Sequence, residues 1–381
     1  MTNIDKMDTI TEKDLNYLEE TIKLYSDTDK KLLVNKLKQA SIITERENLF
    51  NSVEHSNKNN FDLIKESILK HREETLKVIE EFEIDRVYKY GAMFYIDVDI
   101  ENLVFNESLK NLKENQSFFA TESNPTVHTK DDLYIIKFID ICKGTKYIEE
   151  TQELRTDTSR YPMLAIFHSN DNIFEIKVPF ISVILRNSDK EFYYNKIKKL
   201  KEHLESYFNV DLKAINMYNL VSNISNDKNN NDVKVSSQKM QLASGGEATL
   251  NSSNESNETI LPILGELSSI LSNNDILFNK NEDTIKIKEL INDFIDDTNV
   301  TSELPWVSLR WSHDIKTKRI QVKFLFDHYS NYEFTLMEFY NNSRRMEGMR
   351  YVADYLIKKY KEHNSGTSYQ KNWRTRNYLI F

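Results

Sequence analysis

Acidic residues at alternating positions form the first group in the sequence that could bind a metal ion. Asp97, Asp99 and Glu101 occupy every second position of the stretch IDVDIE. Successive side chains of a β-strand point to opposite faces, so a strand would direct all three carboxylates to one side. Carboxylate oxygens are preferred Mg²⁺ ligands, and a bound Mg²⁺ could support phosphoryl transfer. The alternative interpretation is the solvated face of an amphipathic strand, since no phosphate-binding glycine loop precedes these residues.

A second group has the residue types of a metal-dependent nuclease. Asp140 lies near the end of one apolar run, and Glu175 and Lys177 form an E-x-K triplet in a later one. In such enzymes the two acids hold Mg²⁺ and the lysine positions the attacking water. The sequence therefore offers, as an alternative function, a Mg²⁺-dependent nuclease or phosphotransferase built on either carboxylate group. An E-x-K triplet also arises frequently by chance, so this hypothesis requires that the three side chains converge.

Other reaction classes lack their motifs. The 381 residues include only seven glycines, and they contain neither a G-x-G-x-x-G nor a G-x-x-x-x-G-K-[ST] phosphate-binding loop. The sequence also has no H-E-x-x-H, C-x-x-C or G-x-S-x-G, which argues against a dedicated zinc site and a serine hydrolase. The single cysteine, Cys142, follows an apolar run and is expected to be a buried structural thiol. No cofactor is expected, apart from Mg²⁺ under the alternative function.

Positive charge is concentrated toward the C-terminal end of the chain. Residues 301–381 hold 14 Lys and Arg against 8 Asp and Glu, a net charge of +6, while residues 1–300 have a net charge of −15. Cations fix phosphate groups and aromatic rings stack on bases, and single-stranded nucleic acid requires both kinds of contact. An acidic protein surface is an equally suitable partner. The residues expected to make these contacts are Arg344, Arg345, Arg350, Lys371, Trp373, Arg374 and Arg376.

The first 86 residues are predicted to form a helical layer. Apolar residues recur with helical spacing in residues 11–25, 29–43 and 61–82. Thr11 followed by Asp14 is a capping-box pattern that starts the first helix. The mixed charges on the polar faces are typical of solvated surfaces, which favours a packing layer over an interaction module.

Residues 87–221 are predicted to form an α+β domain with a mostly antiparallel sheet. The hydrophobic period changes to two at residues 87–105, where Phe94 and Ile96 alternate with more polar side chains. Further strands are expected at 132–141, 163–169 and 173–185, with hairpin-turn residues between the last two. A helix follows at 191–208. Consecutive strands followed by a helix favour antiparallel pairing.

A polar segment separates this domain from the last part of the chain. Residues 222–259 consist largely of Asn, Ser, Asp, Lys and Gly. They are predicted to form a disordered linker or loop, because they cannot bury enough apolar area to offset the entropy of ordering. Residues 260–381 are expected to form a second, smaller, basic α+β domain with a helix at 346–363. Gly366 is expected to end that helix, and the last residues are expected to run extended.

The chain as a whole has the character of a soluble, cytoplasmic protein. Its first residues show neither the cationic region nor the apolar core of a secretory signal. Its longest apolar runs are far shorter than the roughly 18 residues of a membrane-spanning helix, so no membrane partner is expected. The oligomeric state is left open. The main functional hypothesis is a cytoplasmic binding or assembly component that contacts nucleic acid or an acidic protein surface through its basic C-terminal domain.

Overall fold

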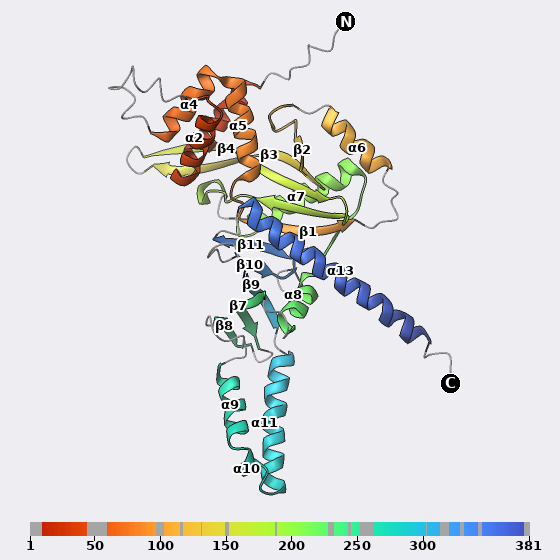
Figure 1. Cartoon of the computed structure of the whole chain (residues 1–381). Helices are drawn as coiled ribbons and strands as arrows, with labels where there is room; N and C mark the ends of the chain where they lie inside the picture. The colour runs from red at the N-terminus through yellow and green to blue at the C-terminus, as the bar shows by residue number, and fades with distance from the viewer. Residues whose placement is uncertain are drawn as a thin grey trace. The chain divides into compact units, whose positions relative to one another are not determined.

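The computed structural model confirms the α+β class (Figure 1). The described strand pairs within each unit are all antiparallel. The chain divides into two compact units, Met1–Ala214 with Arg344–Glu347, and Ile215–Ser343 with Gly348–Phe381. The structure describes residues 10–43, 59–96, 103–114, 117–130, 132–148, 152–186, 189–227, 232–242, 245–251, 262–301, 303–312, 320–327, 331–341 and 345–376.

The predicted N-terminal helical layer is present in the first unit. Thr11 caps the first helix through the expected capping box, because its hydroxyl accepts from the Asp14 N–H (3.1 Å) while the Asp14 carboxylate accepts from the Thr11 N–H (3.2 Å). Leu18, Leu33 and Ile64 are fully buried in a core that the helices share. The helices are α1 (Glu12–Leu24), α2 (Asp27–Gln39), α4 (Asn60–Lys70) and α5 (Arg72–Asp85).

The strands of the first unit pair in the order β2, β3, β4, β5, β1, and β6 also pairs with β1. The strand expected at 87–105 is shorter than predicted, since β1 ends at Ile96 and a helix begins at Leu103. The strands are β1 (Tyr90–Ile96), β2 (Thr126–Lys130), β3 (Leu133–Ile148), β4 (Glu153–His168), β5 (Ile173–Val178) and β6 (Leu212–Ala214). The remaining described helices of this unit are α6 (Leu103–Glu114), the 3₁₀ helix η2 (Val183–Arg186) and α7 (Phe192–Phe208).

Helices lie on both faces of this part of the sheet (Figure 1). On one face, Thr21 of α1 accepts a hydrogen bond from the backbone N–H of Arg160 in β4 (2.8 Å), and α5 carries acids that reach β3. On the other face, Phe208 of α7 packs against Phe174 of β5, with ring centroids 6.2 Å apart. Side chains that alternate along β3, β4 and β5 are therefore divided between two different interiors.

The second unit contains another antiparallel set of strands, in the order β11, β10, β9, β7, β8. Alternate residues of the inner strands are buried, for example Leu309 and Trp311 in one strand and Val322 and Phe324 in the next. Trp311 meets Tyr355 of the last helix edge to face, at 6.0 Å. The strands are β7 (Val233–Gln241), β8 (Glu247–Asn251), β9 (Glu303–Trp311), β10 (Ile320–Leu325) and β11 (Leu336–Asn341). The described helices are α8 (Met217–Asn226), α9 (Pro262–Asn273), α10 (Asp275–Phe278), α11 (Glu282–Thr301) and α13 (Met346–Arg376).

The prediction of a disordered linker at 222–259 is wrong for much of that segment. Strand β7 pairs with β9 on one side and with β8 on the other. Val233, Val235 and Met240 of β7 are buried, while most of the residues between them are polar and partly exposed. A mainly polar segment can form a strand when a few apolar side chains on it are buried and a neighbouring strand completes its hydrogen bonds.

The expected end of the last helix at Gly366 is also wrong. Helix α13 continues through Gly366 to Arg376, so residues 371–376 are helical and not extended. A glycine inside a helix costs about 1 kcal/mol relative to alanine, which weakens a helix without ending it. Residues 377–381 lie outside the described part of the chain.

Candidate functional site

The three residues of the nuclease hypothesis do not converge. Asp140 lies opposite Tyr161 in the β3–β4 pairing, whereas Lys177 lies opposite Leu164 in the β4–β5 pairing. Directly opposed residues of antiparallel strands share a face of the sheet. Tyr161 and Leu164 are three positions apart in β4 and so point to opposite faces. Glu175 and Lys177 share one face of the sheet, and Asp140 lies on the other.

Asp140 forms an ion pair on the α7 face. Its carboxylate accepts from Lys196 Nζ of α7 at 2.6 Å and from the Cys142 thiol at 3.1 Å. Burial, reinforced by the negative charge of Asp140, raises the pKa of Cys142 to about 12. The predicted structural role of Cys142 agrees with its 3% exposure. A thiol with so high a pKa is a poor nucleophile, because the thiolate is the reactive form.

Glu175 and Lys177 belong to a closed ionic group on the opposite face. Glu175 Oε2 lies 2.7 Å from Lys177 Nζ, and Glu175 Oε1 lies 2.5 Å from His168 Nε2. Burial alone would raise the pKa of Glu175, but the positive charge of Lys177 and the hydrogen bond from His168 lower this pKa to about 2. All three side chains are 3% exposed or less, so this group has no solvent-facing surface on which a substrate could bind.

A larger buried ionic network on the same face was not predicted. Lys137 Nζ lies 2.6 Å from Glu80 and 2.7 Å from Glu83, and Arg160 donates to both oxygens of Glu83, at 3.1 and 2.9 Å. Burial would raise the pKa values of both glutamates, but the neighbouring cations lower them below their usual range. A signal was present in the sequence, since Lys137 interrupts the otherwise apolar run LYIIKFI.

The acids and cations of this network pair with one another. Glu80 also accepts from the Ala120 N–H (3.1 Å) and from the Thr126 hydroxyl, and the Tyr25 hydroxyl donates to Glu83 (2.9 Å). Buried charges that are paired and hydrogen-bonded are expected of a structural network, and removal of one partner is strongly destabilising. Within the described residues, no group of three or more His, Cys, Asp and Glu side chains could hold a metal ion.

The remaining predicted site residues are only partly described. Arg345 is exposed, and Arg350 Nε lies 3.8 Å from Asp354 one turn later on α13. Helix α13 also carries Lys371, Trp373, Arg374 and Arg376, whose side chains lie outside the described part, as does Arg344. Asp97 and Asp99 lie outside it as well.

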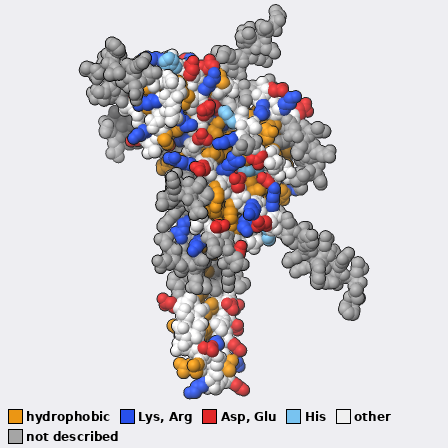
Figure 2. Space-filling view, viewed as in Figure 1, with side chains coloured by type: hydrophobic (Ala, Val, Ile, Leu, Met, Phe, Trp, Pro, Cys, Tyr) orange, Lys and Arg blue, Asp and Glu red, His pale blue; other side chains and the backbone are white. Residues whose placement is uncertain are grey.

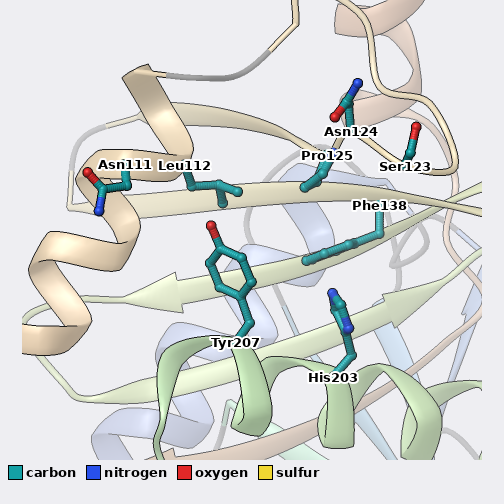
Figure 3. Close-up of a pocket in the computed structure, with 8 residues that line it drawn as sticks. All are labelled: Asn111, Leu112, Ser123, Asn124, Pro125, Phe138, His203 and Tyr207. Atoms are coloured by element: carbon teal, nitrogen blue, oxygen red, sulfur yellow. The ribbon is translucent and has the colours of Figure 1, made fainter.

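A pocket of about 320 Å³ opens in the first unit, beside α6 and α7 (Figure 3). Phe138 of β3 and the α7 residues His203 and Tyr207 form an aromatic wall. Phe138 and His203 meet edge to face, with centroids 5.6 Å apart at 89°, and His203 and Tyr207 are 6.3 Å apart. The other lining residues are Asn111, Leu112, Ser123, Asn124 and Pro125.

The helical hairpin α9–α10–α11 of the second unit is the other candidate. Its buried cluster consists of Leu264, Leu271 and Ile295, with Leu267, Phe278 and Ile291 packed against them, all from the hairpin itself. On α11, Ile287, Leu290 and Phe294 are 49, 63 and 58% exposed. These three residues follow the i, i+3, i+7 spacing of one helix face. We call them the hairpin patch. Ile270, Ile276, Leu277 and Ile285 of the hairpin are also exposed.

Acidic residues accompany the hairpin patch. Residues 262–301 hold eight Asp and Glu against three Lys, a net charge of −5. Asp283, Asp293 and Asp297 each lie three or four residues from a member of the patch, which makes them its neighbours on the helix surface. Figure 2 shows hydrophobic and acidic side chains together on the end of the hairpin. The hairpin therefore presents a surface that is apolar and acidic.

The described helices include none with the length and apolar character to cross a membrane. The functional assignment depends on the geometry of the pocket and the hairpin, because no protein-family model and no curated protein matches the sequence of this chain.

Proposed function

We propose that the protein is an assembly component, in which the α9–α11 hairpin of one molecule binds the basic C-terminal segment, residues 368–381, of a second copy. The exposed hairpin patch carries this proposal. The hairpin packs Ile291 and Ile295 of α11 between its own helices, whereas Ile287, Leu290 and Phe294 stay exposed beside them, so a partner is needed to remove this patch from water. Contiguous exposed apolar residues with polar neighbours are typical of protein interaction sites.

The charge of the hairpin indicates which kind of segment binds to it. A surface with a net charge of −5 favours a cationic partner that also has apolar side chains. The sequence SYQKNWRTRNYLIF, residues 368–381, holds Lys371, Arg374 and Arg376 and no acidic residue. It also contains Trp373, three other large apolar residues and two tyrosines. Pairing between two hairpins is less favourable, because it would bring two acidic surfaces together.

The path of α13 supports binding to a second molecule. Its last described buried residues include Leu356 and Ile357, and its backbone continues as a helix to Arg376. At 1.5 Å per residue the helix extends about 28 Å beyond Ile357. A contact between different surfaces on two copies is heterologous, and it builds rings or filaments according to the rotation between neighbours.

The proposal is tested by oligomeric state and by direct binding. Sedimentation velocity over a range of concentrations should show self-association that weakens with salt, because opposite charges are screened. A fluorescein-labelled peptide of residues 368–381 should bind a chain truncated after residue 367. Leu290→Asp combined with Phe294→Asp should weaken peptide binding by about tenfold or more, equivalent to about 1.4 kcal/mol.

Two controls make the test specific. Leu69→Asp places a charge on an equally exposed leucine of α4 (73% exposed), and it should leave both assays unchanged. A triple variant in which Lys371, Arg374 and Arg376 are all changed to Glu should not associate. Adding Asp283→Lys and Asp293→Lys to this triple variant should restore association, because the charges are then opposite again. A wild-type chain that stays monomeric and does not bind the peptide contradicts the proposal. If the same chain instead binds single-stranded oligonucleotides and loses that binding in the triple variant, the C-terminal segment is a nucleic-acid contact.

A further inference from the structure

We infer that the pocket between α6, β3 and α7 binds a flat, uncharged heteroaromatic ring of the nucleobase class. The inference rests on the pocket of the first unit alone and is independent of the assembly proposed for the second unit. A volume of about 320 Å³ lies at the small end of the range for small-molecule sites. A nucleoside or one unstacked nucleotide base is a ligand of that size class.

The aromatic wall determines the shape of the ligand. Phe138, His203 and Tyr207 place three rings along one side of the pocket, and Leu112 and Pro125 lie across from them (Figure 3). A flat ring that enters this space can stack on or meet the edges of these side chains. Stacking of a base on an aromatic side chain contributes about 1–3 kcal/mol.

The lining also determines the charge of the ligand. The eight described residues that line the pocket include no Lys, Arg, Asp or Glu. A phosphate or carboxylate placed in the pocket would lose water without gaining an ionic partner there. The pocket thus favours the base over the phosphate of a nucleotide.

Polar groups at the pocket match the edge of a base, which carries both hydrogen-bond donors and acceptors. In Figure 3 the Tyr207 hydroxyl points toward Leu112 across the pocket, and Asn111 lies beside Leu112 on α6. Ser123 and Asn124 lie at the rim, with their polar ends directed away from Tyr207. A tyrosine hydroxyl and a histidine ring can each donate or accept, so Tyr207 and His203 are the residues that would contact the edge of the base.

One ring of the wall adjoins the core. Phe208 follows Tyr207 in α7 and is 1% exposed, and its ring packs against Phe174 of the sheet. Tyr207 and Phe208 meet edge to face at 5.0 Å. Tyr207 itself is 43% exposed and His203 is exposed as well, so both rings are accessible to a ligand from solvent.

Saturation-transfer NMR with adenosine, guanosine, cytidine and uridine tests the inference on the full chain. At least one nucleoside should show transfer, and His203→Ala and Tyr207→Ala should reduce it. His71→Ala, at the exposed end of α4, is the matched control and should leave it unchanged. Thermal unfolding of each variant separates loss of binding from loss of the fold.

The source of the base is decided by two further ligands. Adenosine monophosphate should bind no more tightly than adenosine, and tighter binding would overturn the uncharged-ligand inference. Single-stranded homopolymeric oligonucleotides that bind through His203 and Tyr207 more tightly than nucleosides would identify an unpaired strand as the source. The inference fails if neither the four nucleosides nor the oligonucleotides bind, or if the His203 and Tyr207 variants bind them as the parent does.

Discussion

The ammonium group of Lys137 lies 2.6 Å from Oε2 of Glu80, and neither side chain is more than 4% exposed. Lys137 comes from the sheet and Glu80 from α5, so the pair ties the helical layer to the sheet. Lys137→Met should destabilise the first unit by about 3–5 kcal/mol, because it leaves Glu80 and Glu83 charged and buried without their common cation. Thermal or denaturant unfolding measures the loss. Lys130→Met, at an exposed position of β2, is the control. If both changes lower the free energy of unfolding equally, the argument is contradicted.

Acid should weaken the first unit through its buried glutamates. The pKa of Glu175 is about 2 in the folded protein and 4.5 without the fold, and the pKa values of Glu80 and Glu83 are lowered as well. Carboxylates with lowered pKa values contribute stability that is complete above pH 4.5 and is lost as the pH falls toward 2. For Glu175 the loss is on the order of 3 kcal/mol, since one pKa unit corresponds to about 1.4 kcal/mol.

Unfolding at a series of pH values checks this dependence. Glu175→Gln should be less stable than the parent near neutral pH and should lose less stability as the pH falls. If the two proteins show the same slope with pH, another group causes the acid sensitivity.

Gly144 is expected to be intolerant of a side chain. A Cβ atom at this position would lie 2.2 Å from the carbonyl oxygen of Ile184 in η2, and backbone atoms cannot move aside as a flexible side chain can. Gly144→Ala should therefore cost about 1–3 kcal/mol. A Cβ atom added to Gly265 of α9 would have no atom within 4 Å. Gly265→Ala should therefore stabilise its helix by up to about 1 kcal/mol. Calorimetry on both variants tests the contrast, and a neutral Gly144→Ala would show that η2 moves freely.

Cys142 should react slowly with thiol reagents in the folded protein. Its side chain is 3% exposed and the pKa of its thiol is raised to about 12, chiefly by burial. At mildly alkaline pH little thiolate is present and access is restricted, so labelling should require unfolding of the first unit. The rate with a chromogenic disulfide reagent, with and without denaturant, measures this. Rapid labelling of the folded chain would show that β3 opens locally around Cys142.

Features that depend on neighbouring residues could be predicted from the sequence alone. The capping box of Thr11 and Asp14, the helical layer and the strand around 132–141 follow from patterns within a few residues, because helix and strand periods place side chains on one face. The antiparallel pairing of the consecutive strands β2 to β5 follows for the same reason, since short connections join them.

Strand β7 shows why composition was insufficient. Residues 233–241 contain few apolar side chains. These side chains become buried only when β9, which lies more than sixty residues later in the chain, pairs with β7. Local composition measures the apolar area that a segment carries, whereas the pairing decides whether its backbone groups and its few apolar side chains leave water.

The candidate site residues depended on the tertiary structure still more strongly. The residue types of Asp140, Glu175 and Lys177 suit a nuclease, but the pairing register places Asp140 across the sheet from the other two. The sequence by itself determined the helical layer of the first 86 residues, the strands around 132–141 and 163–169, and the segregation of acidic and basic charge along the chain. Only the tertiary structure decided that Lys137 neutralises two glutamates, that three rings line a pocket, and that one face of α11 stays exposed. The physical reason is that a shift of one residue in strand register moves a side chain to the opposite face, and no local pattern specifies the register between distant strands.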